Sequence, residues 1–177
     1  MEGVQIILAI LTIAMSGVVS GIVTFQLNAR RDARELRRQK LEAVYESFNG
    51  FVTQLGGYWI PYLGVMANKI EYNTALDMTI KNSNSEVKYF RTLEMLIAIY
   101  FPKLQPHLDE LNGVKEIANE VINQHKEEYR AIGPHKSEVL AKMQALSKEL
   151  SLIEERFREA ARNEADKLNK KIPGGDC

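Results

Sequence analysis

The pattern of hydrophobic and polar positions changes sharply near residue 28. From Val4 to Leu27 the chain carries no charged residue. As a helix rising about 1.5 Å per residue, a stretch of about 24 residues covers about 36 Å, longer than the hydrocarbon core of a bilayer at about 30 Å. The pattern therefore predicts one transmembrane helix, an anchor within residues 1–28.

A basic segment over residues 29–40 follows the apolar run. Only Glu2 and the terminal amine precede the run, whereas a cleaved signal peptide would have its basic residues in front of a shorter apolar core. The positive-inside rule places the N-terminus outside and residues 28 to 177 in the cytosol. Orientation alone explains this segment, although such residues also attract anionic lipid. Its basic residues are Arg30, Arg31, Arg34, Arg37, Arg38 and Lys40.

Small and hydroxyl-bearing residues recur on one face of the predicted anchor. Residues four apart stack on one side of a helix, and small residues let membrane helices approach closely. This face predicts self-association or pairing with another membrane protein, although hydroxyls can also bond to their own helix. An aqueous pore is a weaker interpretation, because the face has no ionisable residue. The face consists of Thr12, Ser16, Gly17, Ser20, Gly21 and Thr24.

Helical spacing continues beyond the basic segment. Apolar residues from Leu41 to Leu55 recur every third or fourth position, and Gly56-Gly57 then interrupts the pattern. We expect a second helix from about Pro61 to Lys81, because proline is tolerated in a first turn. The alternative is one long helix that kinks at the glycines and the proline.

Two further helices are predicted before residue 134. Asn82-Ser83-Asn84-Ser85 has the composition of a turn, and Ser85 could cap a helix that Pro102 ends. The next helix covers about Lys103 to Ala131, and Gly133-Pro134 closes it.

The last helix has a heptad seam. Its apolar residues alternate steps of four and three over about three repeats. The chain is thus predicted to be all-α, with an antiparallel bundle of about four helices over 41–172 and a flexible tail over 173–177. The seam could close inside this bundle or across a dimer, and the first option is favoured because the other amphipathic helices need partners. The seam residues are Val139, Met143, Leu146, Leu150, Ile153 and Phe157.

Charge and cysteine content narrow the functional classes. The 23 basic and 23 acidic residues leave no net charge, so nothing indicates nucleic acid as a partner. The single cysteine, Cys177, cannot form an intramolecular disulfide, which suits a reducing compartment.

Motifs of known catalytic chemistry are missing from the sequence. There is no GxxxxGK[ST], GxGxxG, GxSxG, HExxH or CxxC pattern. We therefore expect neither an enzyme nor a bound cofactor.

Each histidine has a glutamate three residues later, which places both on neighbouring positions of a helix. Helical bundles can bind metals with such ligands, which makes His107, His125 and His135 weak candidates for a metal site. The favoured interpretation is structural: His125 lies at the edge of the core and is satisfied by a neighbouring carboxylate.

Four aromatic residues gather around the glycines and Pro61. Core packing is the favoured role of Tyr58, Trp59, Tyr62 and Tyr72. The alternatives are the wall of a ligand pocket or the membrane interface, where amphipathic rings settle.

These patterns predict a single-pass membrane protein whose cytosolic bundle is an interaction or assembly module. Its expected partners are membrane lipid and other proteins, possibly itself, without a cofactor. A second hypothesis is a membrane-perturbing effector, of toxin or lysis type, that oligomerises through its anchor. A third is a metal-binding helical bundle.

Overall fold

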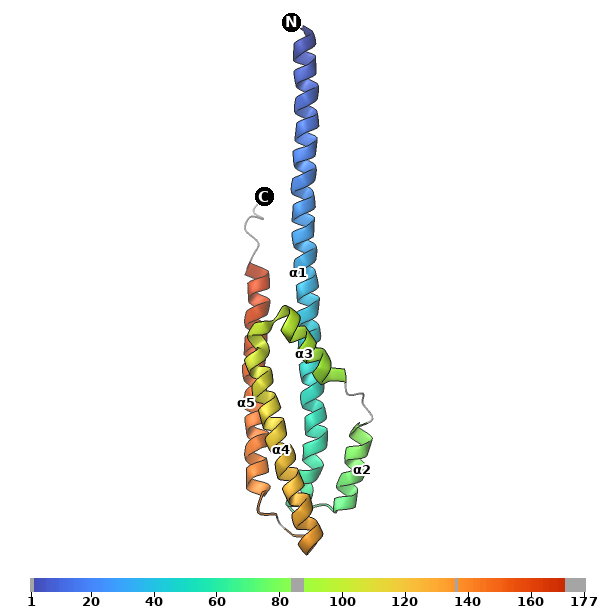
Figure 1. Cartoon of the computed structure of the whole chain (residues 1–177), viewed down its shortest axis with the longest axis vertical. Helices are drawn as coiled ribbons and strands as arrows, with labels where there is room; N and C mark the ends of the chain where they lie inside the picture. Colours follow the sequence, from blue (N-terminus) through green and yellow to red (C-terminus); the bar gives the residue numbers. More distant parts are fainter. Residues whose placement is uncertain (1, 84–87, 136, 171–177) are drawn as a thin grey trace. The chain divides into compact units, whose positions relative to one another are not determined.

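The computed structural model describes residues 2–83, 88–135 and 137–170, with side chains for 16–82, 89–135 and 137–169. Five α-helices and one short 3-10 helix make up these residues, without a strand among them (Figure 1). The prediction of an all-α chain is confirmed. The helices are α1 (Glu2–Met66), α2 (Tyr72–Ser83), α3 (Lys88–Tyr100), η1 (Pro102–Leu104), α4 (Gln105–Ile132) and α5 (Leu140–Lys170).

The chain divides into two compact units, Met1–Gln39 and Lys40–Cys177. Helix α1 contributes to both. The first unit, as far as the structure describes it, consists of residues 2–39 of α1 alone. In the second unit, the rest of α1 packs with the other helices in a bundle. The two units are treated separately below.

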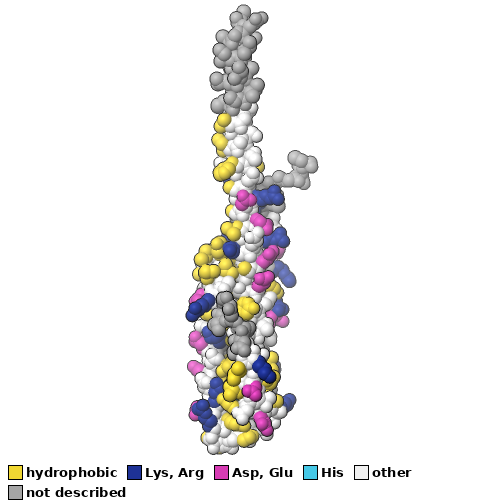
Figure 2. Space-filling view, turned by 90° about the vertical axis from the view of Figure 1, so that its right-hand side faces the viewer, with side chains coloured by type: hydrophobic (Ala, Val, Ile, Leu, Met, Phe, Trp, Pro, Cys, Tyr) yellow, Lys and Arg dark blue, Asp and Glu magenta, His cyan; other side chains and the backbone are white. Residues whose placement is uncertain are grey.

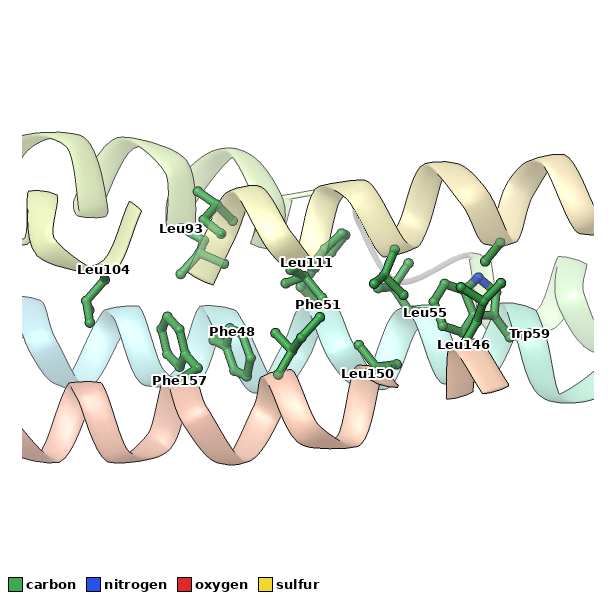
Figure 3. Packing of buried hydrophobic residues seen from close by; sticks show 14 of the residues in the cluster. Phe48, Phe51, Leu55, Trp59, Leu93, Leu104, Leu111, Leu146, Leu150 and Phe157 are labelled. Carbon is green, nitrogen blue, oxygen red and sulfur yellow. The ribbon is translucent and has the colours of Figure 1, made fainter. Parts of the chain in front are cut away.

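The bundle of the second unit encloses one hydrophobic core between α1, α3, α4 and α5 (Figure 3). Helix α1 contributes a buried side chain at every third or fourth position, which is the spacing of one helix face. Burying one such large apolar side chain stabilises a fold by about 1.5–3 kcal/mol. The buried hydrophobic residues of α1 are Leu41, Val44, Phe48, Phe51, Leu55, Trp59, Tyr62, Val65 and Met66.

The heptad seam of the last helix lies in this same core. All six predicted residues, from Val139 to Phe157, are less than 9% exposed. Phe157 stacks on Phe48 of α1, with ring centroids 3.7 Å apart and planes 3° from parallel. The seam therefore closes inside the chain's own bundle.

The predicted helix from Pro61 to Lys81 is wrong. Helix α1 runs through Gly56, Gly57 and Pro61 and ends at Met66. Two helical glycines cost about 1 kcal/mol each, less than the burial of Trp59 and Tyr62 contributes. Proline has no N–H, so the carbonyl of Gly57 has no helical donor, and the side chain of Asn82 supplies one instead.

Asn68 marks the true end of α1. Its φ of 54° is left-handed, a conformation that asparagine tolerates better than most residues. Its N–H donates to the carbonyl of Val65 at 2.8 Å, and that of Lys69 donates to Gly64 at 2.9 Å. These two bonds form a Schellman motif, which turns the chain toward α2.

Two other helix ends lie where the prolines and glycines of the sequence predict them. Helix α3 ends before Pro102, and α4 ends at Ile132, directly before Gly133, whose φ of 74° favours glycine. The predicted turn over 82–85 is wrong at its start, because α2 continues through Ser83. Asn84, the proposed cap Ser85 and the tail over 173–177 lie outside the described residues.

Candidate functional sites

Six large apolar side chains are exposed on α1 between residues 16 and 27. Their exposed fractions run from 50% at Val23 to 74% at Phe25. Figure 2 shows hydrophobic side chains along this stretch. Patches of this kind usually mark a surface that contacts lipid or another protein. The six are Val18, Val19, Ile22, Val23, Phe25 and Leu27.

The predicted membrane span covers residues 4–27. Over the residues that the structure describes, none of the helices combines the length and the apolar character that crossing a membrane requires. The side chains of residues 4–15 lie outside the described part.

The small-residue face lies on α1 in the first unit. Ser16, Gly17, Ser20, Gly21 and Thr24 are exposed there, and the side chain of Thr12 falls outside the described residues. A methyl group added at Gly17 or Gly21 would meet no described atom within 4 Å. Another helix could thus approach this face closely.

The basic segment is also helical. Arg30, Arg31, Arg37 and Arg38 are exposed, and Arg34 is half-buried. Lys40 belongs to the bundle, where its Nζ lies 5.9 Å from the ring centroid of Tyr100.

Two of the three histidines, His107 and His135, do not pair with the glutamate three residues later. Near His107, Glu110 instead bonds to Arg156 of α5, with Nη2 and Oε2 2.8 Å apart. Glu138 is exposed, and the carboxylate beside His135 is that of Glu128.

His125 differs most from its predicted environment. It is 0% exposed, and neither ring nitrogen has a hydrogen-bond partner among the described residues. The expectation of a core-edge histidine satisfied by a carboxylate is therefore wrong. Burial lowers the pKa of His125, while the nearby carboxylate of Glu128 opposes that shift.

Glu128 connects two residues of the α4–α5 turn. It accepts a hydrogen bond from Ser137 Oγ at 2.6 Å, and its Oε2 lies 3.7 Å from His135 Nε2. The hydrogen bond from Ser137 is the main cause that lowers the pKa of Glu128, and Gln124 donates a further bond. His125 completes this group, because its ring centroid lies 6.2 Å from that of His135.

A metal site is not formed by these residues. Within residues 2–83, 88–135 and 137–170, no group of three histidine, cysteine or acidic side chains is arranged to hold a metal ion.

The four aromatic residues pack at the end of the bundle that holds the α1–α2 turn. Trp59 and Tyr62 are buried, and Tyr62 meets Tyr58 and Tyr72 edge-on. Lys126 of α4 places its Nζ 5.0 Å from the ring centroid of Tyr62. Packing thus accounts for these rings.

A small pocket opens beside Tyr58. Its volume is about 220 Å³, below the 300–1,000 Å³ of typical ligand sites. Phe51, Leu55 and Phe90 form its apolar wall, and Lys115 is the one charged residue among the described residues that line it. The Lys115 ammonium already lies 4.8 Å from the Phe90 ring centroid and bonds to Asn112.

Comparison with models of known protein families, with curated proteins and with solved structures finds no match to this chain.

Proposed function

We propose that this chain is a single-pass membrane protein whose helical bundle is an interaction and assembly module at the cytoplasmic face. The anchor is the uncharged run of residues 4–27, with the N-terminus outside. The bundle then lies on the side that carries Arg30, Arg31 and the rest of the basic segment.

The observation that supports this proposal most is the exposed apolar surface of residues 16–27. Water is a poor solvent for Phe25, which is 74% exposed, and for its five apolar neighbours. The hydrocarbon of a bilayer would be a favourable solvent for them. Their place directly before the basic segment agrees with a helix that ends at a membrane surface.

The closed core of the bundle indicates which surfaces of the module a partner could bind. All six seam residues are used in internal packing, so a partner would bind outer surfaces and leave the core closed. A bundle held near a membrane also has a high local concentration, so modest contacts suffice for assembly.

The proposal that the chain assembles can be tested by measuring self-association through the small-residue face. Replacing Gly17 and Gly21 by isoleucine should weaken self-association in a membrane two-hybrid assay, because bulk there keeps the backbones apart. The matched control is Val19→Ile with Val23→Ile, which adds side-chain bulk at the same spacing on another face. Equal signals from the two double variants would refute the role of this face.

A further inference from the structure

One serine joins three parts of the bundle at the α4–α5 turn. The N–H of Ser137 donates to the carbonyl of Met66, the last residue of α1, at 2.9 Å. Its hydroxyl donates to Glu128 of α4 at 2.6 Å and accepts a bond from the N–H of Val139 at 3.3 Å. Ser137 is 4% exposed, so these bonds are sheltered from water. Ser137 thus links Glu128, the α4–α5 turn and the end of α1.

Two histidines lie against this serine-centred arrangement. His135 Nδ1 is 2.7 Å from the carbonyl oxygen of Gly133, so Nδ1 carries the proton and Nε2 faces Glu128. His125 lies deeper, with no exposure and no partner for either ring nitrogen among the residues that the structure describes. A neutral imidazole without partners is already costly in such a place, and a charged one costs more.

We propose that His125, Glu128, His135 and Ser137 form a proton-sensitive latch, which holds the α4–α5 turn against α1 at neutral pH and opens locally when His125 gains a proton. We call these four residues the α4–α5 latch. Opening lets water reach the imidazolium, and that hydration is what favours the open form. The bonds of Ser137 to Met66 and Glu128 then break together.

The groups around His125 decide the direction of this effect. Glu128 on α4 favours a charged His125, whereas a charged His135 disfavours it. Tyr129 on α4 is packed edge-on, with its ring centroid 6.1 Å from that of His125. Two further tyrosines continue the cluster from other helices, Tyr72 of α2 against Tyr129 and Tyr62 of α1 beneath Lys126.

The contact between His135 and Glu128 acts in the opposite direction, because an ion pair there would hold the turn closed. Both side chains of that pair are more than a fifth exposed, and their atoms lie 3.7 Å apart. Partly exposed pairs of this kind contribute little. The complete burial of His125 therefore dominates, and acid should open the latch.

The sign of the pH dependence follows from the lowered pKa of His125. The open form takes up a proton near the ordinary pKa of 6.5, and the closed form does so only at lower pH. The latch is most stable well above pH 6.5 and weakens as the pH falls through that value. The opening constant can rise at most about tenfold between pH 7.5 and 5.5.

Amide hydrogen exchange of the full chain in mild detergent, followed by NMR, tests the proposal. After correction for intrinsic rates, the amides of Ser137 and Val139 should exchange at least threefold faster at pH 5.5 than at pH 7.5. The amides of Ile153 and Phe157, in the middle of α5, should not change. A smaller rise at Ser137 and Val139, or an equal rise at all four amides, would overturn a local latch.

Two variants and one direct measurement separate His125 from other causes. His125→Leu should abolish the acid response, whereas the control His107→Leu, elsewhere on α4, should keep it. A response that survives in His125→Leu would overturn the proposal. If that variant does not fold, an NMR pH titration of the His125 ring signals in the unmodified chain still tests the proposal. A titration midpoint below pH 6.5 would agree with the latch, and a midpoint at or above pH 6.5 would contradict it.

Discussion

The side-chain amide of Asn82 donates a hydrogen bond to the backbone carbonyl of Gly57, 25 residues earlier, at 2.9 Å. Pro61 is the reason that this carbonyl is available. In a regular helix the N–H of residue 61 would donate to it, and proline has no N–H. This one bond from α2 thus satisfies the carbonyl that Pro61 leaves without a donor, and it also links α2 to α1.

Asn82→Ala should lower the free energy of unfolding by about 0.5–1.5 kcal/mol, the usual effect of one lost hydrogen bond. The fluorescence of Trp59, the single tryptophan, reports unfolding well because this side chain is 1% exposed. Denaturant titration of the full chain in mild detergent gives the value.

Pro61→Ala provides the control for that prediction. Alanine restores an N–H that can bond to Gly57, so Asn82→Ala should cost less in the Pro61→Ala background. An equal cost in both backgrounds would show that the bond does not compensate for the proline.

Three glycines, Gly50, Gly57 and Gly64, follow one another at intervals of seven on α1. A methyl group at Gly50 would lie 2.6 Å from the ring of Tyr89, and one at Gly64 would lie 2.9 Å from Ile70. Close packing against α1 therefore depends on the missing side chains.

Gly50→Ala should bring no gain in stability, although alanine is favoured over glycine in a helix by about 1 kcal/mol. The ring of Tyr89 must move to admit the methyl group. The matched control is Gly113→Ala in α4, where the methyl group meets nothing within 4 Å and should stabilise by about 0.5–1 kcal/mol. Equal effects in the two thermal melts would contradict the close approach at Gly50.

Phe157→Ala should be among the most damaging single changes in the bundle. The side chain is fully buried and stacks on Phe48, and such truncations cost about 3–5 kcal/mol. Leu152→Ala on the same helix is the control, because Leu152 is exposed and its loss should cost less than about 0.5 kcal/mol. The same Trp59 fluorescence assay measures both, and a cost below about 1 kcal/mol for Phe157→Ala would contradict the buried seam.

The sequence predicted what depends on repeated spacing. The burial of Met143, Ile153 and Phe157 follows from a period that fits one helix face, and the stops at Pro102 and Gly133 follow from local chemistry. These features need no knowledge of distant contacts.

What the sequence did not predict depends on contacts between distant residues. Because Gly56-Gly57 with Pro61 has the local signature of a break, one helix running through this site was only the alternative prediction. The bond from Asn82 and the surrounding core explain why that alternative holds. Asn68 is a weak sequence signal for the C-terminal end of α1, because asparagine sometimes replaces glycine at the left-handed position that ends a helix.

The histidines illustrate the same limit. Spacing placed a glutamate beside each of them, yet Glu110 bonds to Arg156 and Glu128 bonds to Ser137. The full burial of His125 arises where the α4–α5 turn meets the end of α1. No feature of the local sequence around His125 indicates that meeting point.

Anchoring by residues 4–27 is the central claim, and extraction of cell membranes with alkaline carbonate tests it most directly. Arginine disfavours insertion by about 2.5–3.5 kcal/mol at the centre of a span and by less toward its ends. Val19 lies in the inner half of residues 4–27, so Val19→Arg is the informative variant and Val19→Leu its control. The account predicts that the unmodified chain and Val19→Leu stay in the membrane pellet, and that part of Val19→Arg is released. Release of the intact, unmodified chain into the supernatant would contradict the account.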